Sequence, residues 1–269
     1  MTALAWIKER GRSGTLVLMP PRLHIDSPLR SGASLSLPDA AARHVQVLRL
    51  QPGAALRLFN GAGGEWSASV TRMGRGTVDV QVGEHHPVER ELALHVTLAL
   101  GMPANERMDA LVEKATELGA AAIQPLVCAR SVLRLAGERA DKRVAHWRAV
   151  AVAACEQSGR TRVPQVHPVR SIGDWLTALA PPRAGESRLL LSLGEMAAAP
   201  GSLPAGATDA MLCLSGPEGG LDAAEEAAAL RHAFMPLSLG PRVLRADTAP
   251  LALLAGLGWA AARTASGPT

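Results

Sequence analysis

Aromatic and cysteine residues are scarce in this chain of 269 residues. Tyrosine is absent, phenylalanine occurs twice and aromatic side chains make up 3% of the sequence, so a broad platform for stacking nucleic-acid bases is not expected. The three cysteines, Cys128, Cys155 and Cys213, are isolated and lack the spacing of metal or redox sites. The eight histidines show no metal-ligand spacing either. We therefore expect buried thiols in a reducing cytoplasm and no bound metal.

Long apolar runs are also missing. No run reaches the roughly 18 residues that a membrane-spanning helix needs, and residues 1–12 lack the apolar stretch of a signal peptide. A cytoplasmic protein without membrane contact is expected. No Walker-type loop occurs, and the glycines at 61–64 have no helix after them, so they are interpreted as a turn. Hydrophobic residues nevertheless make up 48% of the chain, enough for the core of one large or two ordinary domains.

Charge is distributed unevenly along the chain. Residues 1–90 hold 11 basic and 7 acidic side chains, residues 91–170 hold 11 and 8, and residues 171–269 hold 6 and 9. A basic first half indicates a polyanionic partner on the N-terminal side. An arginine-rich surface with no such partner is the alternative.

The first third of the sequence is typical of a small β domain. Asn60-Gly61 separates two strand-like runs at 54–59 and 65–71, which predicts a hairpin, and residues 77–82 alternate with period two. One short helix is expected near 39–48. His85-His86, next to Pro87, is interpreted as a linker.

Strands and helices alternate after residue 88, which predicts a parallel sheet covered by helices on both faces. Asn105 and Gly119 are expected to cap a helix, and Asp222 with Glu225 forms a capping-box pattern. The predicted strands are 92–100, 122–127, 189–193 and 210–214, and the further helices are 140–157, 222–232 and 250–263.

Two glycine-rich turns near the C-terminus are the strongest functional pattern. Residues 215–221 follow one apolar run, and residues 239–249 follow another at 235–239. Small ligands bind at the carboxyl ends of strands in α/β proteins, because the backbone is exposed there. We expect both turns to form one pocket; an ordinary strand-to-helix turn is the alternative for the first.

These segments resemble the 16S ribosomal RNA uracil N-3 methyltransferases of the SPOUT superfamily. The resemblance covers nearly the whole chain after Met19 and has the same segment order. The matching segments are 19–22, 44–49, 107–109, 113–119, 156–160 with 163–164, 215–221 and 237–249. The sequence departs from the family at Ala246-Asp247, where Thr-Glu is usual, and near Asn105.

Residues 1–18 precede Met19, a second plausible start, and are interpreted as an N-terminal extension. The resemblance implies an α/β protein with a PUA-like RNA-binding β-barrel at 19–88 and a SPOUT domain with a trefoil knot at 89–269. It also implies S-adenosylmethionine as cofactor, 16S rRNA of the small ribosomal subunit as substrate, and a homodimer. The implied cofactor-binding residues are Leu193, Gly194, Ser215, Gly216, Pro217, Glu218, Gly219, Leu239, Gly240, Leu244, Arg245 and Thr248.

Methylation of uracil N-3 requires loss of the imide proton. We expect Arg245 to stabilise the developing negative charge and Asp247 to act as proton acceptor, with Glu218 as another candidate and a structural cap as the alternative for either acid. The expected phosphate contacts are Arg22, Arg43, His44, Arg49, Arg160 and Arg162. A knotted methyltransferase for tRNA or large-subunit rRNA, and a non-catalytic RNA-binding assembly factor, are the alternative functions.

Overall fold

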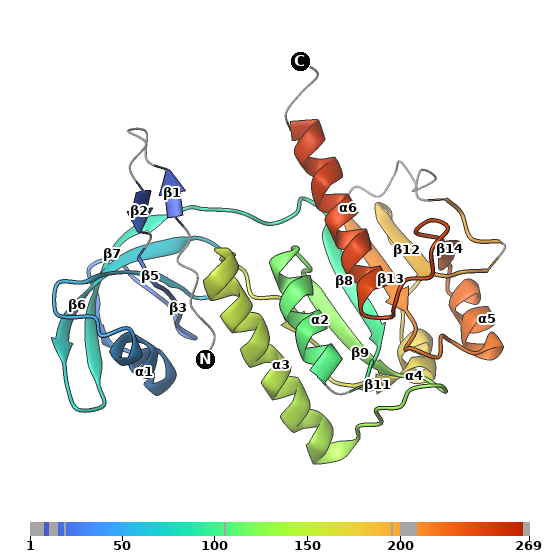
Figure 1. Ribbon diagram of the computed structural model, residues 1–269, viewed down its shortest axis with the longest axis horizontal. Helices are drawn as coiled ribbons and strands as arrows, with labels where there is room; N and C mark the ends of the chain where they lie inside the picture. Colours follow the sequence, from blue (N-terminus) through green and yellow to red (C-terminus); the bar gives the residue numbers. More distant parts are fainter. Residues whose placement is uncertain are drawn as a thin grey trace. The chain divides into compact units, whose positions relative to one another are not determined.

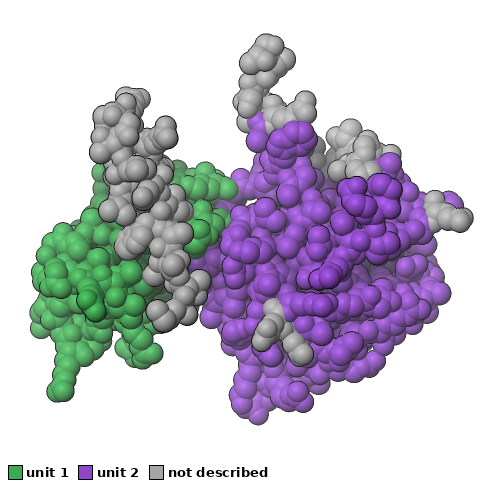
Figure 2. Space-filling view, in the orientation of Figure 1, with its two compact units in different colours: residues 1–90, 155–163 green, residues 91–154, 164–269 purple. Residues whose placement is uncertain are grey.

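The computed structural model describes residues 8–10, 16–18, 20–104, 106–194, 196–199 and 209–265 (Figure 1). Met19, most of the expected extension at 1–18 and the expected cap Asn105 lie outside these residues. The chain divides into two compact units: residues 1–90 with 155–163, and residues 91–154 with 164–269 (Figure 2).

Unit 1 is built on a five-stranded sheet with the strand order β3-β5-β6-β7-β4. The predicted hairpin is confirmed: β5 and β6 pair antiparallel, with Leu58 opposite Trp66. Alternating residues of the strands and one face of α1 form an apolar core that includes Leu23, Val45 and Val80. The strands are β3 (Arg22–His24), β4 (Ser34–Ser36), β5 (Ala55–Phe59), β6 (Glu65–Met73) and β7 (Val78–His86), and the helix is α1 (Asp39–Val47). A separate antiparallel pair, β1 (Lys8–Arg10) with β2 (Leu16–Leu18), precedes them.

The interpretation of His85-His86 as a linker is wrong. Both residues continue β7, where His85 pairs with Trp66 and His86 pairs with Glu65. The rings of Trp66 and His85 have centroids 4.4 Å apart. This ring contact and the strand pairing extend β7 beyond the alternating run that the sequence indicated.

Unit 2 contains a sheet in which every strand pair is parallel, as predicted, with the order β10-β9-β8-β13-β12-β14 and β11 beside β9. Near-continuous apolar runs form the central strands because both faces of a parallel sheet are covered. The strands are β8 (His95–Gly101), β9 (Ala122–Val127), β10 (Gln165–Val166), β11 (Arg170–Ser171), β12 (Glu186–Leu191), β13 (Ala210–Ser215) and β14 (Met235–Leu237).

Helices cover this sheet. In Figure 1, α2 (Glu106–Glu117) and α6 (Thr248–Ala265) lie side by side in front of it, and these two helices contact each other. The helices α4 (Ile172–Thr177) and α5 (Ala223–Arg231) contribute Trp175 and Ala229 to a buried cluster with Leu214 of β13. The long helix α3 spans Gly137–Ser158. The trefoil knot implied by the resemblance stays a prediction.

Candidate functional site

A cavity of about 610 Å³ lies in unit 2 at the carboxyl ends of β12, β13 and β14. Because the strands are parallel, their carboxyl ends meet at one edge of the sheet, where loops are free to hold a ligand. Residues 242–246 with Ala249, before and at the start of α6, supply one part of the wall. The remaining lining residues are Arg107, Arg130, Leu191, Ser192, Leu193, Gly194, Ser215, Gly216, Pro217, Glu218, Gly219, Gly220, Leu221, Glu226 and Leu239.

The two C-terminal turns expected to share a pocket both contribute to this cavity. Ten of the twelve expected cofactor-binding residues are in its lining: Leu193, Gly194, Ser215, Gly216, Pro217, Glu218, Gly219, Leu239, Leu244 and Arg245. Gly240 and Thr248 are not in the lining, although each is adjacent in sequence to a residue that is. Gly240 adopts a φ of +107°, which explains a glycine between the strand and the loop.

The turn after β13 closes tightly on itself. A Cβ atom on Gly216 would lie 2.9 Å from the Leu221 nitrogen and 3.0 Å from the Gly220 carbonyl carbon. The next element begins with the predicted capping box, in which Asp222 accepts from the Glu225 N–H at 2.8 Å and Glu225 accepts from the Asp222 N–H at 2.9 Å. This arrangement leaves a rigid stretch of backbone facing the cavity.

Glu218 is held within this turn by hydrogen bonds to Ala104, just before α2, and to Arg107 in the first turn of α2. Its Oε1 accepts from the Ala104 N–H at 3.0 Å and lies 3.3 Å from Arg107 Nη1. These contacts engage one of the two carboxylate oxygens, Oε1, in holding the turn, which favours the structural alternative for Glu218.

The two expected catalytic residues differ in position. Arg245 is exposed and lines the cavity. Asp247 is partly buried, is not in the lining, and its buried Oδ1 has no hydrogen-bond partner among the described residues. A buried carboxylate oxygen without a partner lowers the stability of the fold, and this atom is able to accept a hydrogen bond or a proton.

Four charged lining residues were not expected from the sequence: Arg107, Arg130, Arg242 and Glu226. Arg130 lies in the loop after β9 and donates from Nη1 to the Gly219 carbonyl at 2.9 Å. The same loop is fixed because the Ala129 N–H donates to Glu225 Oε1 at 2.7 Å. Only its position just after a predicted strand could have indicated from the sequence that Arg130 lines the cavity.

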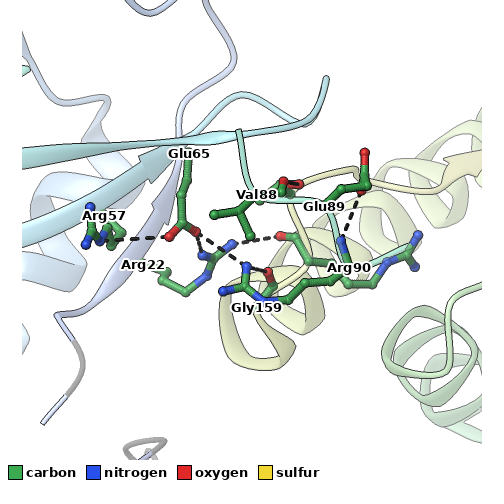
Figure 3. Close-up of polar contacts among 9 residues, drawn as sticks. Arg22, Arg57, Glu65, Val88, Glu89, Arg90 and Gly159 are labelled. Atoms are coloured by element: carbon green, nitrogen blue, oxygen red, sulfur yellow. Dashed lines mark hydrogen bonds and ion pairs between the residues drawn. The ribbon is translucent and has the colours of Figure 1, made fainter. Parts of the chain in front are cut away.

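Arg22 and Arg160, two expected phosphate contacts, are instead buried in unit 1, and Figure 3 shows Arg22 beside Glu65. Arg22 is 7% exposed, forms an ion pair with Glu65 and donates from Nη2 to the Arg160 carbonyl at 2.8 Å. Arg160 itself is 3% exposed. Neither residue is available on the surface for an RNA phosphate, because both are buried and Arg22 is also paired with Glu65.

The other expected RNA contacts are more accessible. Arg43 and Arg49 are exposed on or just after α1. His44 is partly buried, with Nδ1 3.9 Å from a Glu156 carboxylate oxygen. Arg162 has a half-exposed side chain that donates to Glu89 at 2.9 Å and to the Ala62 carbonyl at 2.8 Å, so part of its charge is already compensated.

Within the described residues, no group of three or more His, Cys, Asp or Glu side chains is arranged to hold a metal ion. The cysteines are buried as expected, and burial raises the pKa of the Cys128 and Cys213 thiols to about 12. Among the described helices, none has the length and apolar character needed to cross a membrane.

Comparison with known proteins gives consistent matches. The family model of the RNA methyltransferase domain matches residues 90–258, and that of the RNA methyltransferase PUA domain matches residues 37–83. Ribosomal RNA small subunit methyltransferase E of Synechocystis sp. is 32% identical over 91% of this chain and 79% of its own length. The chain belongs to the ribosomal RNA small subunit methyltransferase E family. The family member of Bacillus subtilis is also 32% identical, over 80% of this chain and 85% of its own length.

Solved structures support the same fold for this family member. A ribosomal RNA small subunit methyltransferase E from Neisseria gonorrhoeae bound to S-adenosyl methionine aligns with a TM-score of 0.83 and 34% identity, over 89% of this chain and 97% of its own. A methyltransferase from Legionella pneumophila in complex with the same cofactor has a TM-score of 0.83 and 32% identity, over 90% and 98% of the two chains.

Proposed function

We propose that the chain transfers a methyl group from S-adenosylmethionine to N-3 of a specific uridine in the 16S rRNA of the small ribosomal subunit. Support comes from family membership, from relatives named for small-subunit rRNA methylation and from two similar structures that contain the cofactor. The observation that carries the proposal is the cavity where the turns after β12, β13 and β14 converge.

The residues of the cavity fit this cofactor. Its volume of about 610 Å³ lies within the range typical of small-molecule sites, and backbone-rich turns alternate with a few polar side chains. We assign the cofactor to the ten lining residues described above together with the neighbouring Gly240 and Thr248. When bound, S-adenosylmethionine supplies an electrophilic methyl group on a sulfonium centre.

Arg245 and Asp247 are proposed to serve the uracil. Arg245 lines the cavity and, as a permanent cation, stabilises negative charge on the uracil oxygens as the imide proton leaves. Asp247 follows Arg245 by two residues and is the proposed proton acceptor. Its buried Oδ1 has no partner among the described residues and lies outside the cavity lining, so the carboxylate has to turn toward the cavity to reach the uracil. Holding the uracil ring nitrogen in line with the methyl group increases the reaction rate further, because the reacting atoms are already oriented.

Unit 1 is proposed to bind the RNA backbone. Arg43 and Arg49 are its exposed candidates, with His44 and Arg162 as partly engaged ones. A cytoplasmic homodimer is also proposed. On the described part of α6, Trp259 is 68% exposed, and Ala255 and Ala260 on the same helix are exposed as well; a second copy would cover these apolar side chains.

The proposed activity is tested by methyl transfer from labelled S-adenosylmethionine to purified small subunits and to free 16S rRNA. We expect one N-3-methyluridine, located by mass spectrometry of nuclease fragments. Label in tRNA or in large-subunit rRNA instead would establish one of the alternative substrates. Cofactor binding by calorimetry without transfer to any RNA would point to the non-catalytic alternative.

The Arg245 role is tested by Arg245→Ala, with Arg183→Ala as matched control because Arg183 is exposed but is not in the cavity lining. Loss of one preorganised donor typically lowers kcat about 10²- to 10³-fold. Near-normal turnover of Arg245→Ala, with unchanged cofactor affinity, would remove Arg245 from the mechanism.

A further inference from the structure

The cavity carries more positive charge than its proposed cofactor requires. Its described lining contains four arginines, Arg107, Arg130, Arg242 and Arg245, but only two carboxylates, Glu218 and Glu226. S-adenosylmethionine has one net positive charge, from a sulfonium, an ammonium and a carboxylate. Like charges repel over such short distances, so binding the cofactor alone would leave the excess cations uncompensated.

Two of the four arginines already have partners inside the protein. Arg107 lies 3.3 Å from Glu218 Oε1, and Arg130 donates to the Gly219 carbonyl at 2.9 Å. Arg242 and Arg245 differ from them. Both are exposed, and within the part of the chain that the structure describes neither lies within ion-pair distance of an acidic side chain.

Arg242 is an exposed residue of the loop between β14 and α6. It follows Gly240, whose φ is +107°, by two residues and precedes Arg245 by three. Its neighbour Val243 is 78% exposed, so this stretch of the cavity wall faces solvent. A guanidinium in such a position presents several donors to an incoming phosphate, which it binds in a bidentate geometry.

We propose that Arg242 binds a backbone phosphate of the RNA strand next to the nucleotide that enters the cavity. The inference rests on the proposed function, because it takes RNA as the ligand at this edge of the sheet. The contact positions the strand without reading its sequence. Arg245 is thereby left for the base, so the two free arginines of one loop serve different parts of the same nucleotide segment.

Equilibrium binding to purified small ribosomal subunits over a range of KCl concentrations, at fixed magnesium, tests the contact. Each phosphate contact on a single strand contributes about 0.7 to the slope of log K against log[salt]. We expect Arg242→Ala to lower the magnitude of this slope by about 0.7 and Arg242→Lys to retain it. Arg183→Ala removes the same charge from an exposed position outside the lining and is expected to keep the wild-type slope.

Calorimetry with S-adenosylmethionine separates a phosphate contact from a cofactor contact. We expect the cofactor Kd of Arg242→Ala to stay within twofold of wild type. The proposal would be overturned if Arg242→Ala kept the wild-type salt slope or if Arg183→Ala lowered the slope by the same amount. A tenfold weaker cofactor affinity of Arg242→Ala would also overturn it. If the wild-type protein leaves the RNA unmethylated, the proposed function fails; a slope reduced in Arg242→Ala alone would still support the phosphate contact.

Discussion

Glu218 and Arg107 form an ion pair of 3.3 Å that joins the turn after β13 to α2. The same carboxylate oxygen accepts the Ala104 N–H at 3.0 Å. Both side chains are partly exposed, so the ion pair itself contributes less than about 1 kcal/mol. The hydrogen bond to the backbone is the more important part, since it sets the position of the turn relative to the start of the helix.

Replacing Glu218 therefore separates a structural role from a catalytic one. Glu218→Gln keeps an acceptor for the Ala104 N–H, and we expect kcat and the cofactor Kd to change by less than about threefold. Glu218→Ala leaves that N–H without its partner, and we expect the cofactor Kd to rise about fivefold, equivalent to about 1 kcal/mol. Calorimetry and single-turnover methylation measure the two quantities. A hundredfold fall in turnover for Glu218→Gln would instead identify this residue as the proton acceptor.

Gly216→Ala tests whether the turn must be free of side chains. The added Cβ would come within 3.0 Å of the backbone of Gly220 and Leu221, and such overpacking typically costs 1–3 kcal/mol. We expect at least a tenfold loss of cofactor affinity by calorimetry. The control is Gly173→Ala, because a Cβ there meets nothing within 4 Å and the position lies in a helix. Equal affinities in the two variants would show that the turn adjusts freely.

Local patterns predicted the elements around the cavity well. The strand at 122–127 was expected and observed, and the Asp222–Glu225 capping box begins α5 as its residue types indicated. These features depend on neighbours within a few residues. The helix α4 was missed, because six residues are too few for a periodic pattern, although Ser171 accepts the Asp174 N–H at its start.

Long-range pairing could not be predicted from residue type. Arg22 was expected on the RNA surface because it is basic, yet its partner Glu65 lies 43 positions away and the carbonyl that it binds lies 138 positions away. The segment 155–163 belongs to unit 1 although it is distant in sequence, and the bond from Arg22 to the Arg160 carbonyl is one of its contacts there. Charge in the sequence indicates a possible surface, whereas burial depends on which distant group compensates that charge.

Glu65 is the centre of the charged cluster in Figure 3. We expect replacement of Glu65 to lower the free energy of unfolding more than replacement of its partner Arg22. It pairs with Arg22 and lies 3.8 Å from Arg57 Nε and 3.7 Å from Arg90 Nη1. Glu65→Gln leaves three cations around a neutral side chain, and we expect a loss of about 3–5 kcal/mol in the free energy of unfolding. Arg22→Met still leaves Glu65 two cations, so a smaller loss is expected. Urea unfolding of both variants measures the two losses of stability. A larger loss for Arg22→Met than for Glu65→Gln would contradict the central role of Glu65.

Glu156 makes the stability of unit 1 depend on pH. Burial raises the pKa of its carboxyl, and the His24 N–H at 2.9 Å, His44 and Arg22 only partly oppose this effect. A carboxyl with a raised pKa binds its proton more tightly in the folded state, so its contribution to stability is present below the ordinary glutamate pKa and is lost as the pH rises through the folded value. Glu156→Gln keeps an acceptor for the His24 N–H and cannot ionise. We expect this variant to gain stability relative to wild type as the pH rises from 4 to 7, measured by urea unfolding at each pH. Parallel pH profiles of the two proteins would show that the carboxyl is not the source of the dependence.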